Sequence, residues 1–277
     1  MELGHDSWAT RPAVPGLGAM GMALIAVGAM VVGILWHGSQ TGTSASQPAC
    51  TLLDATQQPP EEESRFVEAR RRMVEEQLRS RDITDPKVLA AMGRIARQRF
   101  APEKLQHLAY ADRALPIDEH QTISQPYIVA LMTQTAQPTA QSRALEIGTG
   151  SGYQAAVLAE LCKEVYSIEI LKPLADSARQ RLAVLGYKNV TTRHGDGYQG
   201  WREHAPFDVI LVTAAPDHVP PALLEQLAIG GRMVIPVGRG SQDLLTLEKQ
   251  QDGTIRRKMI APVLFVPMTG EAQKQPE

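Results

Sequence analysis

The chain has 277 residues, and 28 Lys and Arg against 30 Asp and Glu leave a formal net charge of −2. Hydrophobic residues make up 43% of it, as in ordinary globular domains, which excludes a wholly disordered or collagen-like protein. The charge balance argues against a nucleic-acid partner, because domains that bind nucleic acid usually carry a basic surplus.

Residues 1–64 differ from the rest of the chain. Residues 17–36 form an almost unbroken run of apolar and small residues, long enough for a helix to cross a bilayer core of about 30 Å. We expect an N-terminal segment, 1–37, whose single membrane-type apolar helix serves as an anchor or as a signal sequence. The following residues, 38–64, are rich in Ser, Thr, Gln, Pro and Glu and indicate a flexible linker.

The globular part, residues 65–277, is predicted to begin with helices. Apolar residues recur near helical spacing among the charges of 65–79, which indicates an amphipathic helix. Asp85 followed by Pro86 is typical of a helix start, with the aspartate as N-cap and the proline in the first turn. We therefore expect a helical lead-in over residues 65–141.

Beyond residue 142, short apolar runs alternate with helical ones. The expected strands are 144–147, 165–168, 190–192, 209–212 and 233–236, and the expected helices are 153–162, 171–185 and 220–228. This alternation predicts an α/β fold, a doubly wound and mostly parallel sheet with helices on both faces. Segments 244–249 and 258–266 add strands that we interpret as an antiparallel edge, so the cofactor-binding sheet is expected over 142–268.

The positions of the two cysteines, Cys50 and Cys162, give no indication of a metal centre. A structural zinc site needs about four Cys or His ligands at close spacing, and neither cysteine has such neighbours. Cys162 closes an apolar helical run, which favours a buried inert thiol. We expect neither a metal nor a disulfide framework.

The most informative stretch runs from Leu145 to Tyr153 and reads LEIGTGSGY. A predicted strand passes there into a predicted helix through a Gly-x-Gly-x-Gly turn. Gly148, Gly150 and Gly152 let the backbone turn sharply and approach a ligand with no Cβ in the way. The spacing differs from the dinucleotide pattern G-x-G-x-x-G, because no glycine occupies the third slot of that pattern.

Three acidic residues, Glu146, Glu169 and Asp196, lie at the ends of successive predicted strands. Glu169 follows Gly148 by 21 positions, where a carboxylate can accept both ribose hydroxyls. Asp196 is placed to accept from an adenine amino group. Carboxylates repel a pyrophosphate but suit a ligand with a positive centre. We infer that the ligand is S-adenosylmethionine.

Four motifs resemble those of the protein-L-isoaspartate O-methyltransferase family. They are Gln121-Thr122-Ile123-Ser124-Gln125-Pro126, Leu145 to Tyr153, His194-Gly195-Asp196-Gly197 followed by Gly200-Trp201, and Pro206-Phe207-Asp208 leading to Thr213-Ala214-Ala215-Pro216. The likeness covers roughly residues 70–268 in the same order and leaves out 1–64. It implies a Rossmann-like class I methyltransferase that moves a methyl group from S-adenosylmethionine onto the α-carboxylate of an L-isoaspartyl residue in a damaged protein, which begins repair.

The resemblance also implies site residues. The family's active-site serine falls on Ser124, which the residues alone would favour as the cap of the following helix. The cofactor contacts fall on Thr122, Glu146, Gly148, Thr149, Gly150, Gly152, Glu169, Asp196 and Gly197. Thr213 and Ala214 are expected to line the peptide groove with Ser124. No general base is required, because a carboxylate acceptor with a pKa near 4 is already ionised at pH 7.

One departure from the family pattern precedes the serine motif. Family members usually have Gly-x-Gly where this chain has Asp118-Glu119-His120. Two added acids beside the substrate carboxylate would weaken the binding of an anion. We expect these side chains to point outward, which would leave the type of reaction unchanged.

The expected partners are isoaspartyl peptides and proteins, with no nucleic acid, a membrane contact through residues 17–36, and a monomeric catalytic domain. Because S-adenosylmethionine is made in the cytosol, we expect a cytoplasmic catalytic domain anchored at 17–36, with export to the periplasm as the alternative. Two other functions stay open: a methyltransferase with the same donor acting on another carboxylate or a small molecule, and a non-catalytic membrane-tethered binding protein of the same fold.

Overall fold

The structure is a computed structural model that describes residues 60–273. The expected segment 1–37, with its apolar helix at 17–36, lies outside the described residues, as does most of the expected linker, 38–64. Within residues 60–273, no helix is both long and apolar enough to span a membrane.

The predicted helical lead-in is present. Helix α1, Pro60–Arg72, begins five residues before the expected start of the domain and continues as a π-helical stretch, η1, Met73–Arg79. Helix α2, Pro86–Arg94, starts as predicted, because the Asp85 carboxylate accepts from the backbone N–H of Lys87 at 2.8 Å. Helix α3, Pro126–Ala136, follows a small antiparallel pair, β1 (Leu115–Pro116) and β2 (Thr122–Ile123).

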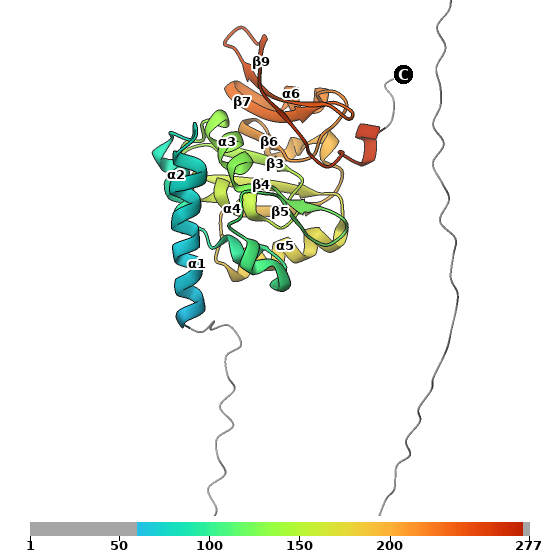
Figure 1. Cartoon of the computed structure of the whole chain (residues 1–277). Helices are drawn as coiled ribbons and strands as arrows, with labels where there is room; N and C mark the ends of the chain where they lie inside the picture. Colours follow the sequence, from blue (N-terminus) through green and yellow to red (C-terminus); the bar gives the residue numbers. More distant parts are fainter. Residues whose placement is uncertain (1–59, 274–277) are drawn as a thin grey trace, which may run out of the picture. The chain divides into compact units, whose positions relative to one another are not determined.

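Seven strands form the main sheet in the order β5-β4-β3-β6-β7-β8-β9. Their bounds are β3 Arg143–Ile147, β4 Glu164–Glu169, β5 Val190–His194, β6 Phe207–Val212, β7 Leu227–Val237, β8 Gln242–Lys249 and β9 Ile255–Val263. Strands β3 to β7 pair in parallel, whereas β8 pairs antiparallel with both β7 and β9. In Figure 1 the sheet runs from β5 at one end to β9 at the other. The prediction of a mostly parallel sheet with an antiparallel edge is confirmed.

Helices cover both faces of the sheet. Alternate strand residues such as Ala144, Val165 and Val209 pack with the helical lead-in, with α4 (Tyr153–Ala159) and with α5 (Lys172–Val184). The opposite strand residues pack with the short helix α6, Pro221–Glu225, in a second core. Because side chains alternate along a strand, neighbouring residues of the central strands enter different cores.

Some predicted boundaries are wrong. The predicted helix 220–228 ends at Glu225, and β7 begins at Leu227 instead of near residue 233. Leu227 is buried and pairs in parallel with Phe207, so tertiary pairing overrides the local helical pattern. The predicted helix 153–162 likewise ends early, at Ala159.

Candidate functional site

The predicted site residues gather at one edge of the sheet. Strand β3 lies between β4 and β6, so the chain leaves it in opposite directions, and ligands of such sheets bind outside the carboxyl ends of the strands at this point. The glycine turn follows β3, Glu169 ends β4, and Thr213 follows β6. The fold therefore brings these residues together at the carboxyl ends of neighbouring strands.

The glycine turn has the backbone geometry for which glycine was predicted. Gly148, Gly150 and Gly152 have φ of 95°, 52° and 88°, a region that side chains disfavour. A Cβ on Gly148 would lie 2.5 Å from Oγ1 of Thr213, so the turn and the end of β6 approach too closely for any side chain. Gly152 instead faces Leu182 and serves the packing of α4 against α5.

A narrow cavity of about 70 Å³ lies against this turn. Of the predicted cofactor residues, Thr122, Gly148, Gly150, Glu169 and Gly197 line it, together with Ala214 and with residues 266–269. The Glu169 carboxylate is held in place, because Oε2 accepts from the N–H of Gly150 at 2.8 Å and Oε1 from that of Leu171 at 3.0 Å.

The chemistry of this cavity suits a nucleoside with no phosphates. Among the described residues that line it, none is Lys or Arg, and Glu169 supplies the one ionisable group. A carboxylate can accept from ribose hydroxyls, whereas it would repel a pyrophosphate. These residues therefore fit S-adenosylmethionine better than a dinucleotide.

Glu146 lies beneath the turn and does not line the cavity. Its side chain is completely buried, and its Oε2 accepts from the Ser167 hydroxyl. The Ser167 and Thr149 hydroxyl oxygens are 2.6 Å apart, so a chain of hydrogen bonds joins Glu146 to the glycine turn. Burial raises the pKa of Glu146 to about 8, so this carboxyl group holds its proton at neutral pH.

Asp196 is beside the cavity but bonded to backbone. Its Oδ1 accepts from the N–H of Tyr198 at 2.9 Å, and its Oδ2 accepts from the N–H of Glu271 at 2.8 Å. Glu271 belongs to the last described turn, η6, Gly270–Gln273. Asp196 therefore holds the C-terminal segment in place by hydrogen bonds. The residues just before this segment, 266–269, form one wall of the cavity.

A wider groove of about 490 Å³ contains Ser124. The helix after it is capped at Gln125 with no side-chain bond, so Ser124 is not the helix cap that its position alone favours. Thr122 and Thr213 line both this groove and the narrow cavity, and the two spaces meet there. The Thr213 hydroxyl donates to the carbonyl oxygens of Ile147 and Gly148, at 3.0 and 2.7 Å.

Sequence reasoning missed Arg97, which supports the serine loop. This arginine has no exposed surface, and it donates from Nε to the Ala109 carbonyl and from Nη2 to the Ser124 carbonyl, both at 2.7 Å. Its guanidinium lies 4.6 Å from the centre of the Tyr153 ring. Burial lowers its pKa. Its sequence neighbourhood carries no signal for this role, because its partners lie 12 and 27 residues away.

The Asp118-Glu119-His120 departure lies in the turn between β1 and β2. All three residues are exposed, as expected, and none lines the groove or the cavity. Glu119 and His120 have φ of 57° and 56°, in the left-handed region that glycine adopts without strain. The turn therefore has a backbone suited to glycine although it carries none.

Comparison with known proteins gives a consistent set of relatives. A family model described as Protein-L-isoaspartate(D-aspartate) O-methyltransferase (PCMT) matches residues 68–273. A protein-L-isoaspartate O-methyltransferase of Synechococcus sp. is 54% identical over 232 residues, 81% of this chain and 95% of that protein. Another, of Opitutus terrae, is 59% identical over 203 residues, 73% of this chain and 87% of that protein.

Solved structures agree with these sequence matches. A protein-L-isoaspartate O-methyltransferase has a TM-score of 0.66 at 28% identity, covering 73% of this chain and 67% of that one. A putative enzyme of the same name from Plasmodium falciparum, in complex with S-adenosyl-L-homocysteine, has a TM-score of 0.63 at 25% identity, covering 72% of this chain and 98% of that one.

Proposed function

This chain belongs to the protein-L-isoaspartate O-methyltransferase family, and we propose that it methylates the α-carboxylate of L-isoaspartyl residues in damaged proteins. The methyl ester of such a residue can close to a succinimide and reopen partly as normal aspartate, which makes the reaction a repair. The observation that carries the proposal is the meeting of two spaces at Thr122 and Thr213. One space lies against the glycine turn, and the other contains Ser124.

When bound, S-adenosylmethionine supplies a methyl group on a positively charged sulfur. We assign Glu169 to the ribose hydroxyls, and the backbone of Gly148 and Gly150 to the wall against which the nucleoside lies. We also assign cofactor contacts to Thr122, Thr149 and Gly197. The residues that hold these walls in place are Glu146, Gly152 and Asp196.

The acceptor needs positioning more than activation. A carboxylate with a pKa near 4 is ionised at pH 7, so the enzyme does not have to remove a proton. We assign the Ser124 hydroxyl as a donor to this carboxylate, with Thr213 at the boundary between donor and acceptor spaces. Holding two reactants in line contributes about 7–11 kcal/mol in favourable cases.

The test uses two peptides that differ only in one residue, L-isoaspartyl in the first and L-aspartyl in the second. The purified chain is incubated with radiolabelled S-adenosylmethionine, and base-labile methyl ester is counted. We expect ester on the isoaspartyl peptide alone. Equal labelling of both peptides, or labelling of neither, would refute the proposed function.

The regions outside the described residues carry a separate proposal. We propose that residues 17–36 form a membrane anchor, and that the linker 38–64 joins this anchor to a catalytic domain, 65–277, on the cytoplasmic side. The support is the length of the apolar run and the cytosolic origin of the methyl donor. A reporter fused after residue 64 should be active on the cytoplasmic side, and a periplasmic signal would overturn this topology.

A further inference from the structure

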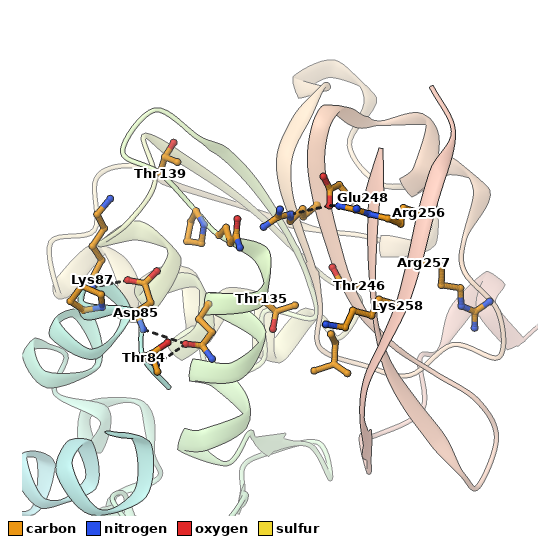
Figure 2. Close-up of a pocket in the computed structure, with 16 residues that line it drawn as sticks. Thr84, Asp85, Lys87, Thr135, Thr139, Thr246, Glu248, Arg256, Arg257 and Lys258 are labelled. Carbon is orange, nitrogen blue, oxygen red and sulfur yellow. Dashed lines mark hydrogen bonds and ion pairs between the residues drawn. The ribbon is translucent and has the colours of Figure 1, made fainter. Parts of the chain in front are cut away.

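A second large space lies beside the substrate groove. This cavity of about 1130 Å³ is bounded by α3 and by the hairpin of β8 and β9. Helix α3 packs over β6 and β7, and beyond them Thr246 of β8 is partly exposed and Lys258 of β9 is exposed. Figure 2 shows Thr135 on the helix facing Thr246 and Lys258 on the strands across the gap. We call this space the basic trench.

The basic trench carries a surplus of positive charge. Among the described residues that line it, four cations, Lys87, Arg232, Arg256 and Lys258, stand against two carboxylates, Asp85 and Glu248. Arg257 pairs with Leu247 of the opposite core, and Figure 2 shows its side chain directed away from the gap. Both carboxylates are already engaged. Glu248 lies 2.6 Å from Arg256 and 3.5 Å from Arg232, and Asp85 caps α2. Lys258 is exposed and forms no ion pair within residues 60–273, so it is available to an incoming anion.

The basic trench and the groove that contains Ser124 share no lining residue, but both lie along the same two elements, α3 and β9. Ile260 of β9 lines the trench, and Pro262, two residues later, lines the groove. On α3, Ile128 lines the groove and Thr135 lines the trench. These two residues are about 10 Å apart along the helix axis, at a rise of 1.5 Å per residue. One polypeptide can therefore follow α3 and β9 from the serine into the trench.

The distance sets which substrate residues reach the cations. Val263 lines the groove and Lys258 precedes it by five residues, about 16 Å along an extended strand. An extended substrate has the same rise per residue. Its side chains roughly four to six positions from the isoaspartate therefore lie at the level of Lys258.

We propose that the basic trench binds the polypeptide on one side of the isoaspartyl residue, and that Lys258 favours substrates with Asp or Glu about four to six positions away. This inference rests on the proposed function and adds a substrate preference to it. Complementary charge at an exposed site sets specificity and encounter rate more than tight binding. An exposed pair is worth up to about 1 kcal/mol, which is about a fivefold effect.

The test compares L-isoaspartyl peptides of about 15 residues, long enough to reach the trench on either side. One peptide has neutral flanks, a second has three Glu at positions four to six before the isoaspartate, and a third has them after it. The measured quantity is the ratio of kcat/KM for each acidic peptide to that for the neutral one. We expect a ratio of about five on one side and about one on the other, carried by KM.

Two variants and a control locate the effect. Lys258→Gln should bring the higher ratio to about one, and Lys258→Glu should take it below one, because the added charge repels the acidic flank. Lys188→Gln makes the same charge change in the exposed turn before β5, at the opposite edge of the sheet, and should leave the ratio at the wild-type value. Salt of about 0.5 M should shrink the ratio by screening.

The possible outcomes distinguish a failure of the trench assignment from a failure of the proposed function. If no isoaspartyl peptide is methylated, the proposed function fails. If the neutral peptide is methylated but both acidic ratios are near one, or if Lys258→Glu leaves a high ratio unchanged, the trench assignment is overturned and the function stands. Inhibition by a single-stranded oligonucleotide with no response to acidic flanks would assign the trench to nucleic acid and also overturn it.

Discussion

Glu146 should make the stability of this protein fall as pH rises through neutrality. Its folded pKa of about 8 lies above its ordinary value of 4.5, because the side chain is completely buried. Between these values the unfolded chain releases the proton and the folded chain keeps it. The unfolded state therefore binds fewer protons, and the free energy of unfolding decreases with pH.

The magnitude follows from the two pKa values. The full difference corresponds to about 5 kcal/mol once pH exceeds 8, and the part between pH 5 and pH 7 is about 2–3 kcal/mol. Glu146→Gln keeps the shape of the protonated carboxyl and cannot ionise. We expect this variant to lose that decline and to be the more stable protein at pH 8.

The assay is urea unfolding of the wild type and of two variants between pH 5 and pH 8. Because other groups also titrate, the informative quantity is the difference between the curves of Glu146→Gln and wild type. Glu103→Gln, which removes an exposed carboxylate from the lead-in, is the control and should follow the wild type. Parallel curves for wild type and Glu146→Gln would refute the assignment of Glu146 as a buried, protonated support of the glycine turn.

Substitutions at Glu169, at Arg97 and in the turn between β1 and β2 should change cofactor binding, turnover and stability, respectively. Glu169→Gln should weaken adenosylhomocysteine binding by about 10- to 100-fold in calorimetry, because a charged acceptor contributes roughly 1.5–3 kcal/mol, and an unchanged Kd would contradict its ribose role. Arg97→Lys should lower kcat about tenfold with little change in KM, because one bond to the Ser124 loop is lost, and an unchanged kcat would argue against positioning. Replacing Glu119 and His120 by glycine should raise Tm by about 2–4 °C, because left-handed strain is relieved, and a lower Tm would show that the turn is not strained.

The sheet was predictable because its central strands are buried on both faces. Such strands appear in the sequence as short apolar runs, and the residue after each run marks the ligand-binding edge. Glu169 and Thr213 could be placed at the site for this reason. The start of β7 could not be predicted, because Leu227 joins the strand only through its pairing with Phe207, a contact between distant segments.

The parts of the site that escaped prediction depend on side-chain direction or on non-local contacts. Glu146 precedes the glycine turn in the sequence, but the pleat of β3 turns its side chain beneath the helices, away from the cavity. Arg97 reaches Ser124 across 27 residues. The C-terminal wall of the cavity forms because Pro267 bridges to Ala215, which no local pattern indicates.

We expect Ser124 to contact the acceptor carboxylate where the groove and the cofactor cavity meet. The most direct measurement is kcat/KM for an isoaspartyl peptide with Ser124→Ala, together with the Kd of adenosylhomocysteine for the same variant. We predict a loss of about 10- to 100-fold in kcat/KM, the contribution of one hydrogen bond to a charged group, with the Kd unchanged. Retained kcat/KM, or a loss matched by weaker adenosylhomocysteine binding, would contradict this expectation.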